Sequence, residues 1–90
     1  MIISKTPYRI SFFGGGSDYP IWYNKYSGAV LSTSINKHLY ITCRILPKFF
    51  DHNFRIVWSK IEMVKNIQDI EHPTVKDLLN FLKIKQGLEI

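Results

Sequence analysis

An arginine, a run of three glycines and an aspartate lie close together near the start of the chain. Arg9 stands in a strand-like apolar segment, and Asp18 follows Gly14–Gly16. Arginine is a permanent cation with five hydrogen-bond donors in a planar group, and glycine lets a ligand approach the backbone closely. The carboxylate adds an acceptor at the mouth of the turn. This pattern predicts a site for a small polar ligand that is rich in hydroxyls or negatively charged.

The same residues also fit a purely structural role. A glycine run is a frequent loop signal, Arg9 would then be solvated, and Asp18 would cap a turn. Neither phosphate-loop formula, Gly-x-x-x-x-Gly-Lys-Ser/Thr or Gly-x-Gly-x-x-Gly before a helix, is present. Residue chemistry alone leaves both interpretations open.

The elements that must position these residues are mostly strands. Periodicity and β-forming residues predict strands at residues 2–13 (one bent strand or a pair, interrupted at Pro7), 29–35, 39–46, 54–59 with 60–64 as an extension, and from 88 onward. A short helix is expected within 20–26, and a tight connection at 36–38 separates the second and third strands.

One main helix is expected near the end of the chain. Pro73 suits a first helical position, and Gly87 is a plausible stop. The apolar residues recur at the helical spacing i, i+3, i+4, i+7: Val75, Leu78, Leu79 and Leu82. The fold class is therefore α+β, with a mixed or antiparallel sheet and one main helix.

Two adjoining segments resemble a known enzyme family. Residues 6–20, Thr-Pro-Tyr-Arg-Ile-Ser-Phe-Phe-Gly-Gly-Gly-Ser-Asp-Tyr-Pro, resemble the first signature of the GHMP small-molecule kinases, which include galacto-, homoserine and mevalonate kinases. Residues 27–37, Ser-Gly-Ala-Val-Leu-Ser-Thr-Ser-Ile-Asn-Lys, match the Gly-Gly-Ala-Val-Leu-Ser-Thr-Thr-Ile-Asp-Lys pattern of the D-glycero-D-manno-heptose 7-phosphate kinase branch. The resemblance extends over all 90 residues and is strongest over residues 5–44.

The resemblance implies an ATP-dependent sugar kinase with ATP and Mg²⁺ as cofactors. Its first implied substrate is D-glycero-D-manno-heptose 7-phosphate, phosphorylated at the anomeric hydroxyl. A galactose- or fucose-type kinase is the alternative within the family, and a non-catalytic binding or interaction module is the alternative outside it. The implied fold is the N-terminal GHMP domain, which has a ribosomal-protein-type βαβ arrangement.

The resemblance also assigns roles to individual residues. It places Arg9 near the transferred phosphoryl group, where a cation would stabilise developing charge. Asp18, flanked by Ser17 and Tyr19, falls at positions that contact sugar hydroxyls. Gly15–Gly16 stand where galactokinases carry Glu-His, which removes a carboxylate contact and enlarges the implied pocket. That change is compatible with a larger or phosphorylated sugar.

Residues 1–90 are expected to form only part of the N-terminal GHMP domain. The family's second glycine-rich signature, Pro-x-x-x-Gly-Leu-Gly-Ser-Ser, its later aspartate and its C-terminal domain have no counterpart in the sequence. Glycine-loop amides at helix N-termini are what hold nucleotide phosphates. The sequence therefore assigns no cofactor-binding residue, and we expect the chain alone to be inactive.

Charge and composition restrict the partners. The net charge of +5, from 12 Lys and Arg against 7 Asp and Glu, raises nucleic-acid binding as an idea. The lysines are dispersed from Lys5 to Lys85 without a basic cluster, so we expect no nucleic-acid partner and attribute the charge to a phosphorylated substrate. Apolar residues make up 46% of the chain, which predicts exposed apolar surface and self-association through it.

The remaining signals are structural. No signal peptide and no apolar run of about 20 residues is present, so the expected location is the cytoplasm without membrane contact. Cys43 is the only cysteine and is expected to be a buried, inert thiol. Trp58 is expected in the core and His72 at the start of the helix. The three histidines share no spacing that would make a metal site: His38, His52 and His72.

Overall fold

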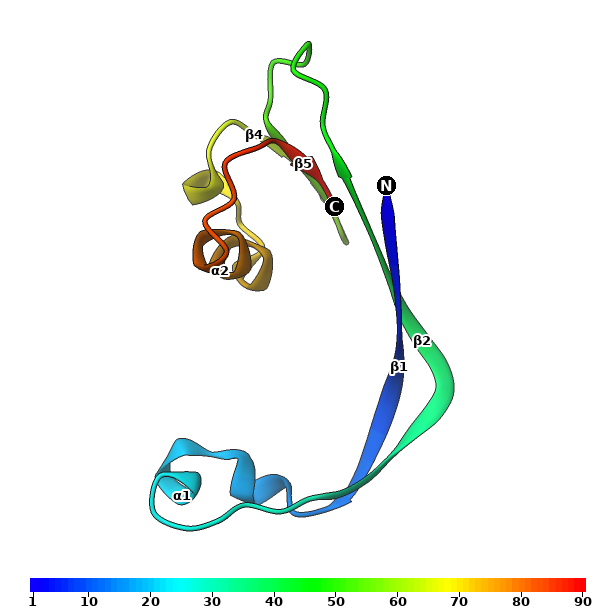
Figure 1. The fold of residues 1–90 in the computed structure, drawn as a ribbon, viewed down its shortest axis with the longest axis vertical. Helices are drawn as coiled ribbons and strands as arrows, with labels where there is room; N and C mark the ends of the chain where they lie inside the picture. The colour runs from blue at the N-terminus through cyan, green and yellow to red at the C-terminus, as the bar shows by residue number, and fades with distance from the viewer. The chain divides into compact units, whose positions relative to one another are not determined.

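The computed structural model describes residues 1–90 and combines five strands with one main helix (Figure 1). The strands are β1 (Ile2–Phe13), β2 (Leu31–Ile45), β3 (Phe54–Val57), β4 (Ile61–Val64) and β5 (Leu88–Glu89). The helices are α1 (Pro20–Tyr23) and α2 (Pro73–Phe81), with 3-10 turns at Gly15–Asp18 and Ile67–Asp69.

The five strands form one mixed sheet in the order β1-β2-β5-β3-β4. β5 runs antiparallel to β2 and parallel to β3, and β3 and β4 are antiparallel. The predicted class, α+β with a mixed sheet and one main helix, is therefore confirmed. No helix in the structure has the length and apolar character needed to cross a membrane.

The chain divides into two units. The first unit comprises Met1–Ser4 and Ile41–Ile90, and the second comprises Lys5–Tyr40. Every buried residue belongs to the first unit. No residue of the second unit is buried, and at 36 residues it is shorter than the roughly 40 residues below which chains usually need a metal, disulfides or association for stability.

The core of the first unit lies between its short strands and the helix region. Phe54 and Ile56 of β3, Leu88 of β5, Leu79 of α2 and Ile70 ahead of that helix form one buried cluster. Side chains alternate along a strand, so the neighbours of Phe54 and Ile56 point to the other face of the sheet. The register therefore fixes which residues of this sheet can meet the helix.

Helix α2 begins where the sequence predicts. Its first residue is Pro73, whose missing N–H costs nothing at this position. His72 is the N-cap residue, and its Nδ1 accepts a hydrogen bond from the Val75 N–H at 3.4 Å. The prediction that His72 starts the helix is confirmed.

The end of α2 differs from the prediction, because the helix stops at Phe81 and not near Gly87. Lys83 adopts φ +53, and the N–H groups of Lys83 and Ile84 bond the carbonyls of Asn80 and Leu79 at 3.1 Å each. This pair of bonds is the Schellman arrangement that closes a helix. Gly87 has another role: a Cβ there would lie 2.5 Å from the Asn53 carbonyl oxygen, so the close backbone approach requires glycine.

The apolar face of α2 is narrower than its spacing predicts. Val75 and Leu79 pack on the core, whereas Leu78 and Leu82 are 52% and 54% exposed. A nine-residue helix on a small sheet contacts it through one row of side chains, so the second row stays in solvent.

β2 is one continuous strand, Leu31–Ile45, where the sequence predicts two strands and a connection at 36–38. The residues at that point are Asn36, Lys37 and His38, and none of them is the glycine or proline that would impose a turn. β1 likewise continues through Pro7, which an edge strand tolerates because the missing N–H can face solvent.

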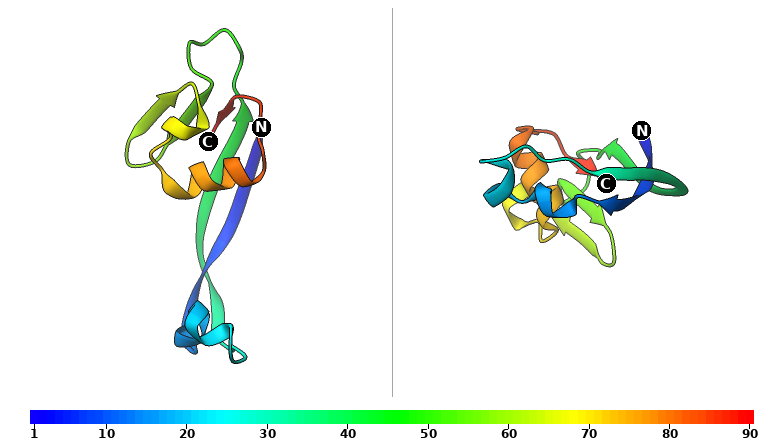
Figure 2. Two further views of the ribbon diagram at one scale, coloured as in Figure 1. Left: turned by 90° about the vertical axis from the view of Figure 1, so that its left-hand side faces the viewer. Right: turned by 90° about the horizontal axis from the view of Figure 1, so that it is seen from below.

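Between β3 and β4 the structure has a tight turn where the sequence suggests one extended strand (Figure 2). The Trp58 N–H bonds the Lys60 carbonyl at 2.9 Å and reverses the chain. Trp58 is 43% exposed, so its predicted core position is wrong. Its indole N–H instead bonds the Glu62 carboxylate at 2.7 Å, because the turn holds the ring at the sheet margin beside that group.

Candidate functional site

The predicted glycine loop follows β1 in the second unit, and its first glycine is required by the backbone. Gly14 has φ +94, a region that only glycine adopts without strain. A Cβ at this position would lie 2.0 Å from the Ala29 carbonyl oxygen. The Ser17 N–H bonds the Gly14 carbonyl at 3.0 Å and closes the turn. Gly14 therefore joins the end of β1 closely to the segment that leads into β2.

The Ser17 hydroxyl is committed to this loop. Its Oγ donates toward the carbonyls of Gly14 at 2.7 Å and Ala29 at 3.1 Å, and it accepts from the Ala29 N–H at 3.1 Å. A hydroxyl has one proton to donate, and these backbone groups already engage it. Ser17 thus orders the loop, a role that its place three residues after Gly14 could have indicated as a serine turn.

Gly15 and Gly16 face open space. No atom lies within 4 Å of a Cβ built at either position, so packing does not demand glycine there. The absence of side chains leaves the backbone of this turn accessible, which is the property that the sequence assigns to a substrate site. Tyr19 follows at the N-cap of α1 and is 65% exposed.

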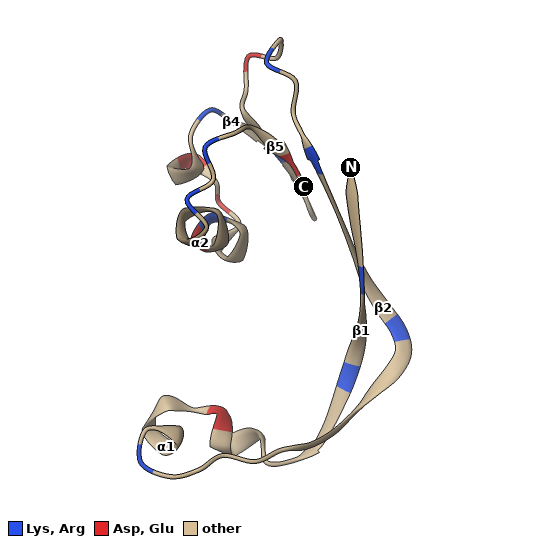
Figure 3. Cartoon of the chain, viewed as in Figure 1, with Lys and Arg blue, Asp and Glu red and all other residues tan.

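Arg9 and Asp18 are the two charged members of the predicted site. Both side chains are exposed, and neither side chain forms a hydrogen bond or an ion pair in the structure. They do not pair with each other, so each retains its full capacity to contact a ligand. Figure 3 shows that Lys and Arg are spread along the chain, as the sequence indicates.

Aromatic side chains adjoin the loop in a way that sequence reasoning did not use. The rings of Trp22 and Tyr26 lie 4.8 Å apart, and the Trp22 indole N–H bonds the Ser27 carbonyl at 3.3 Å. Both side chains are about half exposed. Exposed aromatic faces next to hydrogen-bonding groups suit a sugar ring. Their spacing of four residues, one helical turn, was the signal in the sequence.

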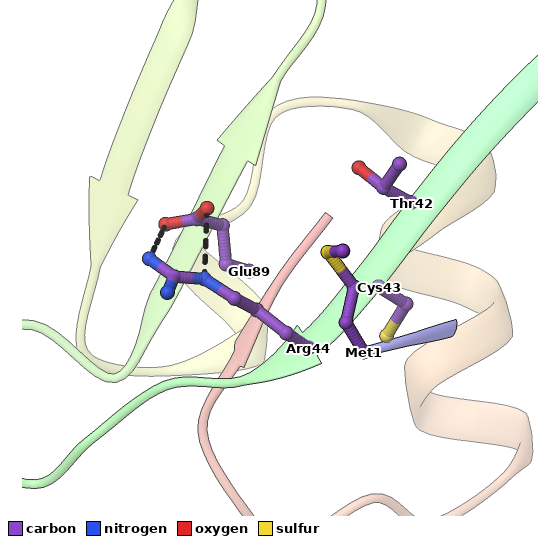
Figure 4. Close-up of a pocket in the computed structure, with 5 residues that line it drawn as sticks. All are labelled: Met1, Thr42, Cys43, Arg44 and Glu89. Carbon is purple, nitrogen blue, oxygen red and sulfur yellow. Dashed lines mark hydrogen bonds and ion pairs between the residues drawn. The ribbon is translucent and has the colours of Figure 1, made fainter. Parts of the chain in front are cut away.

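The first unit contains a pocket of about 220 Å³ that none of the predicted residues lines (Figure 4). Its walls include Thr42, Cys43, Arg44 and Glu89. The Arg44 Nε and Nη2 atoms each bond a Glu89 carboxylate oxygen at 3.1 Å, and Arg55 lies 3.3 Å from the same carboxylate. These hydrogen bonds lower the pKa of Glu89 and raise the pKa of Arg44.

The low pKa of Glu89 predicts a pH dependence of stability. The carboxylate stabilises the folded chain above its unfolded-state pKa of about 4.5, and this contribution is lost as the pH falls through the lower folded-state pKa. Between roughly pH 5 and pH 3, we expect the urea midpoint of the native chain to fall further than that of Glu89→Gln. An equal fall of the urea midpoint between roughly pH 5 and pH 3 in the two proteins would contradict this role of Glu89.

The residues present do not fit a site for Mg²⁺ or for nucleotide phosphates. No group of three or more His, Cys, Asp or Glu side chains is arranged to hold a metal ion. Ahead of α2, the Glu62 carboxylate accepts hydrogen bonds from the N–H groups of Glu71 and His72 at 2.7 and 3.2 Å. The His72 Nδ1 atom accepts one from the Val75 N–H. These donors are already used inside the protein and leave no cradle of free amides at that point.

Comparisons with known proteins identify no relative. No family model, no curated protein and no solved structure matches the chain.

Proposed function

We propose that this chain carries the substrate-side part of a GHMP-type sugar kinase site, located on the loop between β1 and α1. The reaction is ATP-dependent phosphorylation of a sugar or sugar phosphate. D-glycero-D-manno-heptose 7-phosphate, phosphorylated at its anomeric hydroxyl, is the substrate that the sequence signature favours. The reaction belongs in the cytoplasm, where ATP is available.

The geometry of the glycine loop is the observation that carries this proposal. Gly14 and Ser17 fix the turn through backbone contacts, while Gly15 and Gly16 remain open and Asp18 remains unpaired. Packing therefore does not account for glycine at these two middle positions. The backbone requires glycine at Gly14, and Gly15 and Gly16 leave the turn open. This combination supports a ligand-binding loop.

The chemistry of the two charged residues supports the same function. Asp18 offers carboxylate oxygens to sugar hydroxyls through charge-assisted hydrogen bonds. Arg9 offers a fixed cation for a phosphate or for the phosphoryl group in transfer. Neither residue is assigned to holding the nucleotide or Mg²⁺, because the chain has no group of side chains arranged for a metal ion.

Substitution of Asp18 provides a first test. For Asp18→Asn we expect about tenfold or greater weakening of sugar-phosphate binding, since charged hydrogen bonds contribute roughly 1.5–3 kcal/mol. The urea midpoint should not change, because the exposed Asp18 side chain forms no hydrogen bond or ion pair. Asp51→Asn, another exposed aspartate without a partner, is the matched control and should bind normally. Equal affinities for both variants, measured by calorimetry, would remove Asp18 from the site.

Titration with nucleotide tests whether this chain has only the substrate-side part of the site and no ATP-binding part. We expect no saturable binding of ATP at micromolar concentration, with or without Mg²⁺, because the chain presents no phosphate cradle. Calorimetry or a fluorescent ATP analogue measures this directly. Saturable binding that inorganic triphosphate displaces would contradict the assignment of a substrate-side role only.

The alternatives give different binding profiles. A galactose- or fucose-type kinase predicts preference for the unphosphorylated sugar, whereas a heptose-phosphate enzyme predicts preference for the phosphorylated one. A non-catalytic interaction module predicts no affinity for any sugar in the panel. The same calorimetric panel therefore distinguishes all three functions.

A further inference from the structure

β4 forms one edge of the sheet, and its outer backbone groups have no partner strand. The Val57 N–H bonds the Ile90 carbonyl, and the Ile90 N–H bonds the Arg55 carbonyl, each at 2.9 Å. The backbone groups of Arg55 and Val57 therefore face β5, and those of Ile56 face β4. In the antiparallel register Ile56 stands opposite Glu62. The N–H and C=O groups of the alternate residues on β4 consequently point away from the sheet.

The alternate residues are Ile61 and Met63, and their side chains are also exposed. They are 57% and 59% exposed, on the face of the sheet opposite the core. Val57 stands opposite Ile61 in the register and is 46% exposed. The side chain of Glu62 lies on the other face and is buried. The edge thus combines free backbone groups with an apolar side-chain row.

The other edge strand of the sheet carries proline and charged residues along its length, whereas the four residues of β4 include neither proline nor an exposed charge. β1 includes Lys5, Pro7 and Arg9, and edge proline and charged residues are the usual protection. β4 has no proline and no exposed charge within Ile61–Val64. At the start of β4, Lys60 forms an ion pair with Glu71. Lys65 follows the end of β4. Between these two lysines, an exposed apolar edge without proline or charge is a template for another strand.

We infer that β4 pairs with β4 of a second copy of this chain, antiparallel and across a two-fold axis at Met63. The outward groups of Met63 would then meet those of the partner copy's identical residue, and Ile61 would lie opposite Lys65. The exposed Val57, Ile61 and Met63 of both copies form one apolar cluster on the same face. The contact is isologous, since the same residues serve on both sides.

The strand's own composition favours a second copy over a foreign partner. No charged group occupies the two-fold position, and the aliphatic stem of Lys65 can cover Ile61. Each copy carries +5, so repulsion opposes association and added salt should strengthen it. An acidic foreign peptide would show the reverse salt dependence. Because the contact involves only a short strand, the expected dissociation constant is on the order of 100 µM.

Sedimentation equilibrium of the full chain tests this inference. From roughly 10 µM to 1 mM the native chain should pass from monomer to dimer. Met63→Lys and Ile61→Lys should each weaken association by about tenfold or more, because they place charge in the apolar cluster. Met63→Leu should dimerise normally. Ile21→Lys, on an 82% exposed apolar residue of α1, is the matched control and should not affect dimerisation.

Hydrogen exchange on the native chain gives a test that needs no variant. The amides of Ile61 and Met63 should gain protection as protein concentration rises, while the Glu62 amide is protected at every concentration. Circular dichroism establishes that the variants remain folded. A chain that stays monomeric, association that survives both lysine variants, unchanged exchange, or dimerisation that salt weakens would each overturn the inference. None of these results bears on sugar binding, so the proposed function is tested separately.

Discussion

Replacing Glu62 with alanine is expected to destabilise the first unit by about 3–5 kcal/mol, because three hydrogen bonds to a charged acceptor are lost and each contributes roughly 1.5–3 kcal/mol at most. Glu62 is 7% exposed, and its carboxylate accepts hydrogen bonds from the Trp58 indole and from the backbone N–H groups of Glu71 and His72. It thus ties β4 and the β3–β4 turn to the start of α2. Small domains have only about 5–15 kcal/mol in total, so this loss is a large fraction of the stability.

Urea unfolding followed by tryptophan fluorescence and circular dichroism measures this effect. Glu62→Gln keeps one acceptor oxygen and should lose about half as much. Glu71→Gln is the control, because its ion pair with Lys60 is exposed and contributes at most about 1 kcal/mol. A loss below about 1 kcal/mol for Glu62→Ala would contradict the role of this carboxylate as the anchor of α2.

The second large effect is expected at Gly14. Gly14→Ala combines a backbone conformation at φ +94 with a Cβ placed 2.0 Å from the Ala29 carbonyl oxygen. Backbone strain and overpacking of this kind cost roughly 2–4 kcal/mol together. The obstructing atom is backbone, so the loop itself must move. We expect faster amide exchange across residues 14–30 and weaker binding of sugar phosphate.

Gly15→Ala and Gly16→Ala are the matched comparisons. A methyl group at either position meets no atom within 4 Å, so stability should change by less than about 1 kcal/mol. If a ligand approaches this backbone, the same methyl groups should still weaken binding. Equal stability losses at all three glycines would show that the turn is not built as described. Unchanged sugar-phosphate binding in Gly15→Ala and Gly16→Ala would show that the ligand does not contact this loop.

Much of the fold follows from local signals in the sequence. The strand before the glycines, the start of α2 at Pro73 and the final strand at Leu88 were all predictable, because apolar periodicity and proline placement act over a few residues. The interruption expected at 36–38 was wrong since polar residues can continue a strand whose faces remain in solvent. The turn at Trp58 was missed because its sequence contains no glycine or proline.

Other features depend on contacts that sequence spacing does not reveal. The hydrogen bonds from Arg44 to Glu89 join residues 45 positions apart, and they follow from β5 inserting between β2 and β3. The same is true of Glu62, whose partners at the start of α2 are known only once the hairpin folds back. At the candidate site, the sequence predicts the glycine turn after β1. It does not reveal that the Ser17 hydroxyl is hydrogen-bonded to backbone groups while the Asp18 carboxylate has no hydrogen-bond partner.

Amide NMR of the chain during titration with D-glycero-D-manno-heptose 7-phosphate tests the central claim most directly. The claim predicts saturable shifts concentrated in residues 9–19, strongest around Gly15, Gly16 and Asp18. In Asp18→Asn the same shifts should require about tenfold or more ligand to saturate. The first unit should be unaffected, including the pocket beside Arg44. Shifts confined to that pocket, or no saturable shifts with any sugar or sugar phosphate, would contradict the assignment of the glycine loop as a substrate site.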